Sequence, residues 1–390
     1  MTIESVNQSE IVLSVGDTTY LDYGNIKRKR EGAGPQGNGG NGLLLHSALA
    51  VDADTGEPLG LLWQKLWNRQ HAPKPPAAET PKQKKARQAK VRKAKRARPF
   101  EQKESYRWVE AIDTLEPAVE CSTRVIHVFD REGDIAEVFA KLNDCRHAGV
   151  VVRAAHNRSL ENDPHRLWEK LAAQPIRGYH QVELSQTKKR QGRTAKLAVR
   201  YCPLQLRSPA RLGKESQLQV YAVYVDEVDC PEGEDPVSWM LLTSERVDCL
   251  EMAKTIVRWY SYRWRVEDYH KVLKSGCNVE SYRLAAAGMK TLLGFLSVIA
   301  VDLLRLTYLQ RTQPLLPAQT ILTPVQMDVL KAKSPKLPKT LTVEWAVGAI
   351  ARLGGYLEHR RKTPIGIQVL WRGWAKLQAL VEGWQLARQT

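Results

Sequence analysis

The chain has 390 residues, enough for two or three folded domains and a buried core. Its 59 lysines and arginines exceed its 42 aspartates and glutamates, which leaves a formal net charge of +17. This excess favours a polyanionic partner, with nucleic acid ahead of an anionic membrane surface, although a basic protein without such a partner has the same composition. The six cysteines form no C-x-x-C pair, which argues against a zinc finger or a disulfide framework and fits a reducing cytoplasm.

The most apolar stretch of the chain runs from Thr291 to Leu309 and is interrupted by Asp302 and Arg305. Its uncharged part is too short to span a bilayer. We therefore predict a buried helix here, in a soluble cytoplasmic protein without membrane contact.

The first section alternates strand-forming runs with turns. Strands are predicted at 11–17, 43–51 and 59–67, with no helix between them, which is typical of an antiparallel meander. A segment rich in proline, lysine and arginine follows, from His71 to Pro99, and contains almost nothing apolar. We predict a solvated or disordered insertion whose charges suit contact with a DNA backbone.

Further along, the apolar pattern predicts two helices, at 106–115 and 135–142, and two strands, at 124–130 and 149–153. From 156 to 244 the chain shows short alternating runs with polar loops between them, which indicate an all-β insertion. Its strands are expected at 181–184, 195–201, 218–225 and 239–243. After Val247 the chain is mainly helical.

The strongest chemical signal lies between Tyr260 and Lys274. A helix with about 3.6 residues per turn would place on one stripe Tyr260, Arg263, Glu267, Lys271 and Lys274. The carboxylate could bind a hard metal ion, and the cations could bind phosphates. The alternative is an ion pair between Arg263 and Glu267 on a solvated face, and the helix by itself leaves both open.

Two aspartates favour the metal site. Asp17 and Asp130 each end a β-branched run, where a buried sheet delivers side chains to a crevice at its edge. Together with Glu267, three carboxylates within about 5 Å would repel by roughly 3 kcal/mol per pair at an effective dielectric near 20. Two Mg²⁺ ions would relieve this repulsion, activate a water or 3′-OH and stabilise the leaving oxygen. Four other acids compete for these roles, although isolated acids are more often turn or cap residues: Asp22, Asp52, Asp134 and Asp268.

The spacing Tyr260-x2-Arg263-x3-Glu267-x6-Lys274 resembles the Tyr-Arg-Glu-Lys signature of bacterial DDE transposases of the insertion sequence four family. Residues 16–19 and 128–135 resemble that family's first and second acidic motifs, and 343–357 and 369–374 resemble its C-terminal segments. The motifs occur in the family's order over nearly the whole chain.

This resemblance implies an α/β fold in which an RNase H-like catalytic core is interrupted by an all-β insertion domain and followed by a C-terminal helical domain. We expect the first part of the core at 1–155, including the basic insertion at about 71–100. The remaining parts are then the insertion domain at 156–246, the final catalytic helix at 247–285 and a helical dimerisation region at 286–390.

The resemblance also implies roles for individual residues. Asp17, Asp130 and Glu267 would form the catalytic triad and bind two Mg²⁺ ions, for which Mn²⁺ can substitute. The residues implied to contact DNA phosphates are Tyr260, Arg263, Lys271, Lys274, Arg153 and Arg283. Trp239 would stack on a base flipped out of the duplex during hairpin formation, worth roughly 1–3 kcal/mol. Without the resemblance, a core position is the better interpretation of Trp239.

The implied activity is cut-and-paste transposition by metal-dependent phosphodiester hydrolysis and strand transfer. The implied partners are double-stranded DNA, both transposon ends and target, and a second copy of the chain in a synaptic homodimer in the bacterial nucleoid. Family members carry a separate end-binding domain before the first acid, whereas sixteen residues precede Asp17, so we expect end recognition to be lost or supplied elsewhere. Two alternatives stay open: an RNase H-like nuclease that never joins strands, and a truncated DNA-binding or inhibitory fragment.

Overall fold

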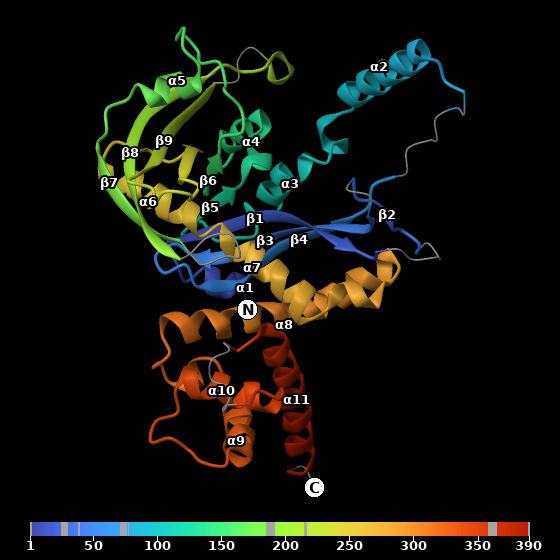
Figure 1. Cartoon of the computed structure of the whole chain (residues 1–390), viewed down its shortest axis with the longest axis vertical. Helices are drawn as coiled ribbons and strands as arrows, with labels where there is room; N and C mark the ends of the chain where they lie inside the picture. Colours follow the sequence, from blue (N-terminus) through green and yellow to red (C-terminus); the bar gives the residue numbers. More distant parts are fainter. Residues whose placement is uncertain are drawn as a thin grey trace.

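The computed structural model describes residues 2–24, 30–37, 40–70, 76, 78–184, 192–213, 217–357 and 365–388. Within these residues, ten strands form one mixed sheet, with helices packed on both of its faces (Figure 1). The strands are β1 (Ile11–Asp22), β2 (Gly34–Pro35), β3 (Asn41–Asp52), β4 (Pro58–Trp67), β5 (Arg124–Phe129), β6 (Ala148–Arg153), β7 (Gly178–Leu184), β8 (Arg193–Leu206), β9 (Leu218–Val228) and β10 (Ser238–Thr243). The α-helices are α1 (Thr2–Val6), α2 (Pro81–Ala97), α3 (Tyr106–Leu115), α4 (Ala136–Leu142), α5 (Leu167–Ala172), α6 (Leu250–Ser261), α7 (Trp264–Lys271), α8 (Ala286–Thr312), α9 (Pro324–Lys333), α10 (Val343–Leu353) and α11 (Ile367–Leu386).

The first part of the sheet has the strand order β4-β3-β1-β5-β6. Strands β1, β3 and β4 pair antiparallel, and β5 and β6 extend the sheet in parallel from β1. The predicted meander is therefore confirmed, and β1 continues past Asp17 to Asp22. This mixed arrangement is consistent with an RNase H-like core.

The second part of the sheet comes from the segment 156–246. Its predicted strands are present, and they continue the same sheet in the order β6-β10-β9-β8-β7. The junction is the antiparallel pair of β10 and β6, in which Leu242 lies opposite Val152. The segment also contains the short helix α5, so it is not purely β. β10 covers an edge of β6 that would otherwise leave backbone groups unpaired.

Alternating side chains give the central strands two buried faces. On β5, Phe129 packs on one face with Trp108 of α3 and Phe139 of α4. Its neighbour Val128 packs on the other face, in the core that includes Tyr269 of α7 and residues of α6 and α8. Helices therefore sandwich this part of the sheet, and α7 lies over the face that carries Val128.

The basic segment 71–99 differs in part from its prediction. Residues 71–75 and 77 lie outside the described residues, whereas Pro81 to Ala97 form α2, none of whose residues is buried. Disorder is thus wrong for this part, and a solvated surface is confirmed. A capping box between Thr80 and Gln83, proline at the first turn and many helix-favouring residues explain the helix. Figure 1 shows α2 standing away from the sheet.

The C-terminal part consists of helices, as predicted, and Figure 1 shows α9, α10 and α11 gathered beyond α8. Within the described residues, α8 is the one helix long and apolar enough to cross a membrane. However, half of its most apolar window is buried inside the protein, and it packs against β4 and α10. Such burial is typical of a core helix and does not indicate a membrane protein.

Candidate active site

Asp17 and Asp130 come together at one place on the sheet. In the parallel pair of β1 and β5, Val15 lies opposite Val128, and the same register two residues further brings Asp17 level with Asp130. Neighbouring strands are about 4.8 Å apart. Asp17 and Asp130 each lie two residues after a valine, Val15 or Val128, on the face covered by α7. Because side chains two residues apart along a strand point to the same face, both aspartates point to that face.

The two aspartates influence each other electrostatically. Burial raises the pKa of Asp130, and the nearby charge of Asp17 raises it further, while the backbone N–H of Glu132 and the cation of Arg263 act in the opposite direction. The Glu132 N–H donates to Oδ1 of Asp130 at 2.8 Å. Asp130 is therefore a largely buried carboxylate beside another acid, whose ionised form an added cation would stabilise.

The third acid, Glu267, is delivered by α7. The single helix expected from Tyr260 to Lys274 is wrong in detail, because α6 ends at Ser261, α7 begins at Trp264, and Val272–Gly276 form a π-helical turn. The turn carries one residue more per hydrogen-bonded ring than an α-helix, which shifts the residues after it around the axis. Lys274, which lies within this turn, forms an ion pair with Glu280, with 3.3 Å between its Nζ and Oε1 of the glutamate.

Arg263 connects the three acids. Its Nη2 donates a hydrogen bond of 2.7 Å to Oε1 of Glu267, so the ion pair considered as an alternative is present. Burial tends to lower the pKa of Arg263, but the neighbouring Tyr260, Glu267 and Asp17 outweigh burial and raise it. Because Arg263 also acts on Asp130, one buried guanidinium lies among Asp17, Asp130 and Glu267.

A residue that the sequence analysis passed over, His270, holds α7 to the strands. Its Nδ1 lies 3.7 Å from Oδ2 of Asp17, and its Nε2 is hydrogen-bonded to Oγ of Ser47 at 3.1 Å. Ser47 lies directly opposite Asp17 in the pairing of β1 with β3. The available signal was its spacing of three residues from Glu267, which puts both side chains on one helix face.

The chemistry of these residues fits a divalent cation, but they are not a closed ligand cage. Within the described residues, no group of three or more His, Cys, Asp or Glu side chains is close enough to hold a metal ion. Carboxylate oxygens are suitable ligands for hard cations. Asp17 and Asp130 repel each other, and a bound cation would relieve this repulsion. Glu267, in contrast, is already paired with Arg263. To bind a metal ion, Glu267 would first have to release Arg263.

Three residues predicted to contact DNA meet on the β6–β10 side of this site. Tyr260 is buried, with its ring edge against Trp239 at a centroid distance of 5.1 Å. Burial raises the pKa of Tyr260, while Arg263 and Arg153 partly oppose that rise, so Arg153 lies close to the phenol. Trp239 is 7% exposed and belongs to the core here. Stacking on a base stays a prediction that requires this ring to leave its packing.

The remaining predicted cations are Lys271, the last residue of α7, and Arg283, which follows α7 in the chain. Lys271 is exposed and has no ion pair among the described residues, and Arg283 is exposed in a left-handed backbone conformation with φ of 45°. Of the competing acids, Asp22 and Asp52 accept backbone N–H groups in turns. Asp134 is buried and held by Arg158. These contacts support structural roles for the three.

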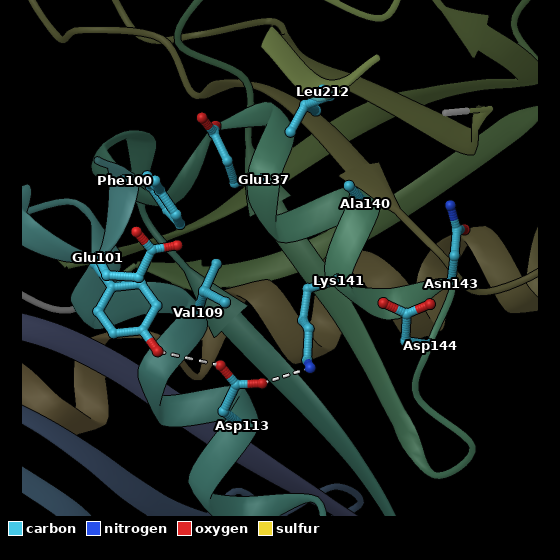
Figure 2. A pocket seen from close by; sticks show the side chains of 11 residues that line it. Phe100, Glu101, Val109, Asp113, Glu137, Ala140, Lys141, Asn143, Asp144 and Leu212 are labelled. Atoms are coloured by element: carbon cyan, nitrogen blue, oxygen red, sulfur yellow. Dashed lines mark hydrogen bonds and ion pairs between the residues drawn. The ribbon is translucent and has the colours of Figure 1, made fainter. Parts of the chain in front are cut away.

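A pocket of about 460 Å³ lies elsewhere, between α3, α4 and the turn Phe100–Gln102 (Figure 2). Asp113, which lines it, accepts from Tyr106 at 3.5 Å and pairs with Lys141 at 2.5 Å. Glu101, Glu137 and Asp144 also line it, so carboxylates dominate its polar groups. An acidic hollow repels phosphates, and α3 and α4 cover the opposite face of the sheet from α7. We therefore place the candidate site at the aspartates and not in this pocket.

A comparison with protein families gives a match over much of the chain. The model of a family described as transposase DDE domain matches residues 80–297, more than half of the sequence. The matched region includes Asp130, Glu267, Arg263 and His270, and Asp17 lies before it.

Proposed function

This chain belongs to the transposase DDE domain family, and from this premise we propose that it is a DNA transposase whose catalytic residues are Asp17, Asp130 and Glu267. The family places the chain among polynucleotidyl transferases and nucleases that act on DNA with divalent metal ions. The observation that carries the assignment is the meeting of two strands and one helix: Asp17 and Asp130 share a register, and His270 binds α7, with Glu267, to Asp17.

The chain's own groups would each have a defined task. The three carboxylates would hold two Mg²⁺ or Mn²⁺ ions, which supply Lewis acidity and an activated oxygen nucleophile when bound. Arg263, released from Glu267, is then positioned to bind a phosphate oxygen near the scissile bond. Lys271 adds an exposed cation one turn beyond Glu267. His270 keeps Asp17 oriented through the contact between α7 and β1.

The proposed reaction is cut-and-paste transposition of the insertion sequence four type. Water attacks a phosphodiester at each transposon end and frees a 3′-OH. This hydroxyl attacks the opposite strand to give a hairpin, water reopens the hairpin, and the 3′-OH finally attacks target DNA. Each step replaces one P–O bond by another, so one site can serve them all and no covalent protein intermediate is required. Transposon ends and target are double-stranded DNA, and two copies of the chain would act together.

The proposal is tested with a matched pair of neighbouring acids. Glu267→Ala should abolish Mg²⁺- or Mn²⁺-dependent cleavage of transposon-end duplexes while leaving duplex affinity in EDTA nearly unchanged. Asp268→Ala removes an adjacent carboxylate, which pairs with Arg265 at 3.9 Å, and should retain cleavage. Equal cleavage by wild type and Glu267→Ala would reject the proposed triad.

Strand joining separates a transposase from a nuclease built on the same core. Duplexes that already carry the free 3′-OH should be inserted into a supercoiled plasmid by the wild-type chain with Mg²⁺. Cleavage of intact duplexes without any insertion of these pre-cut ends would instead identify a hydrolytic nuclease.

A further inference from the structure

Helix α2 carries an unusual concentration of unpaired positive charge. Its 17 residues contain nine lysines and arginines, no acid and no buried residue. Arg87 pairs with Glu79 at 2.7 Å, and the other eight cations form no ion pair among the described residues. Like charges three or four residues apart destabilise a helix in water. This surface is therefore matched to a polyanion that the isolated chain lacks.

The cations are not evenly distributed around the helix. At 100° per residue, an arc of about 100° collects five of them. These are Lys82, Lys85, Arg92, Lys93 and Arg96. We call these five the arm face. The helix is roughly 25 Å long at 1.5 Å per residue. Duplex DNA presents one phosphate charge per about 1.7 Å of its axis, so the arm face has many phosphates within reach of its length.

The base of the arm is fixed to the protein. Arg69, two residues after β4, donates from Nε and Nη2 to both carboxylate oxygens of Glu104, each at 2.7 Å. This bidentate pair joins the chain entering the arm to the chain leaving it. The Arg69 guanidinium also donates to the carbonyl of Gln36 at 2.5 Å and lies over the ring of Tyr20. Thus the arm is anchored to β1 as well as closed at its own base.

The anchor lies on the part of the sheet that carries the aspartates. Tyr20 is three residues beyond Asp17 on β1. At the start of α3, Arg107 donates to Oγ1 of Thr18 at 2.9 Å and pairs with Glu132 at 2.5 Å. Thr18 directly follows Asp17, and Glu132 lies two residues after Asp130. The root of α2 is therefore tied to the second half of β1 and to the turn after β5, the two segments that carry Asp17 and Asp130.

From these observations we propose that α2 is a backbone-binding arm for duplex DNA, which holds the duplex through phosphates without reading its sequence. The inference rests on the proposed function, because the DNA is the substrate of that site. The arm face contributes the cations. The capping box holds the start of α2, and the Arg69–Glu104 pair holds the base of the arm. No residue of α2 is buried, so the arm face is accessible. Lysine and arginine contacts to phosphate position a protein on DNA but carry no base information.

The test replaces the arm face. One variant carries Lys82→Gln, Lys85→Gln, Arg92→Gln, Lys93→Gln and Arg96→Gln, which keep good helix formers. A matched control removes five exposed charges elsewhere: Lys290→Gln, Lys333→Gln, Lys336→Gln, Lys339→Gln and Lys376→Gln. Affinity for two unrelated duplexes is measured in EDTA over a series of salt concentrations.

The slope of log affinity against log salt falls by about 0.9 for every phosphate that the protein no longer neutralises. The arm variant should show a slope smaller by roughly 2 to 4 on both duplexes, and the control variant a slope smaller by less than about 0.5. Equal reductions in both variants would assign the effect to net charge and overturn the proposal, as would an unchanged slope in the arm variant. A larger reduction on duplex RNA than on duplex DNA would also overturn it.

A second readout follows the helix itself. Deuterium uptake by Pro81–Ala97 in the full chain should slow when duplex DNA is added, because phosphates relieve the repulsion between its cations. Uptake by α9 should stay unchanged. If uptake in α2 does not slow, the arm does not bind the duplex. If the arm variant leaves the slope unchanged while Glu267→Ala loses metal-dependent cleavage, the arm is rejected and the proposed function stands. A wild-type chain that binds no duplex rejects the proposed function too.

Discussion

Nδ1 of His270 lies 3.7 Å from Oδ2 of Asp17, across the junction between α7 and β1. The same imidazole is hydrogen-bonded to Ser47 on β3, so one helical residue contacts two neighbouring strands. Glu267 lies one turn earlier on α7. The contact therefore sets the position of the glutamate relative to the aspartates, and it does so from a buried side chain.

Replacing His270 by alanine should weaken metal binding. Residues that orient a metal ligand typically affect affinity or activity by about 10–100-fold. We expect a loss of this size in Mn²⁺ affinity, measured by titration calorimetry on the protein without DNA. His165→Ala is the control, because that ring is 66% exposed and far from the triad in sequence. Unchanged Mn²⁺ affinity in His270→Ala would reduce the residue to a packing role.

Arg263→Ala should make stability depend on metal. The arginine is the buried cation shared by the three acids, and hydrogen bonds to charged groups contribute about 1.5–3 kcal/mol. Without metal, the unfolding free energy should fall by about that amount, since repelling carboxylates lose their cation. Mg²⁺ should restore more stability to the variant than to wild type in urea unfolding. Arg311→Ala, at an exposed position of α8, should show no such difference. Equal Mg²⁺ shifts would contradict the neutralising role.

His127 should make the fold sensitive to acid. It is buried on β5, neither ring nitrogen has a partner among the described residues, and burial lowers its pKa from 6.5 to about 3. The unfolded chain takes up the proton first as the pH falls. Stability from the neutral ring is therefore complete above about pH 6.5 and is lost by roughly 1.4 kcal/mol per unit down to about pH 3.

His127→Leu removes that proton linkage with a side chain of similar volume. The urea midpoint of the variant should fall less than that of wild type between pH 7 and pH 5. If the midpoints of the wild type and the variant fall by the same amount over this pH range, other groups govern acid unfolding. His147→Leu, outside the buried core, is the matched comparison.

Gly16→Ala should disturb the strand beside Asp17. A Cβ at this position would lie 2.9 Å from Cε1 of Phe129 and 3.2 Å from Cζ3 of Trp108. Both rings are buried, so overpacking should cost about 1–3 kcal/mol of unfolding free energy. Because Asp17 is the next residue, metal-dependent cleavage should fall as well. Gly383→Ala lies in α11 with nothing within 4 Å, so it should leave cleavage unchanged and should not lower the unfolding free energy, because alanine favours a helix over glycine. A stable and fully active Gly16→Ala would contradict the packing argument.

The local pattern of the sequence predicted those parts of the fold that depend on neighbouring residues. Apolar runs predicted β1, β3, β4, β5 and β6, and the placement of an acid at the end of two runs indicated Asp17 and Asp130. Parallel pairing of β1 with β5 then brings the two aspartates level, although Asp17 lies within β1 and not at its end. The stripe expected from Tyr260 to Lys274 likewise indicated Glu267 with Arg263, although Arg263 lies just before α7.

What the sequence did not reveal depends on contacts between distant segments. β10 pairs with β6 because β6 is the free edge of the core sheet. No residue pattern in either strand predicts this pairing. His270 looked like one more polar residue of a helix until Ser47 and Asp17 were placed beside it. For α2, charge density suggested disorder, while the signal at Thr80 and Gln83 for a helix start was overlooked.

The hydrogen bonds between β6 and β10 have a mechanical consequence. Two domains joined by a linker can rotate about it, whereas strands sharing a backbone ladder move together. The segment between Arg153 and Ser238 supplies β7, β8 and β9 of the same sheet, and at its two ends Arg153 donates to the Ser238 carbonyl at 2.9 Å. A ligand resting on β7, β8 or β9 is therefore already aligned with Asp130, two strands away from β10 through β6 and β5. Positions along β7, β8 and β9 therefore keep fixed distances from Asp130.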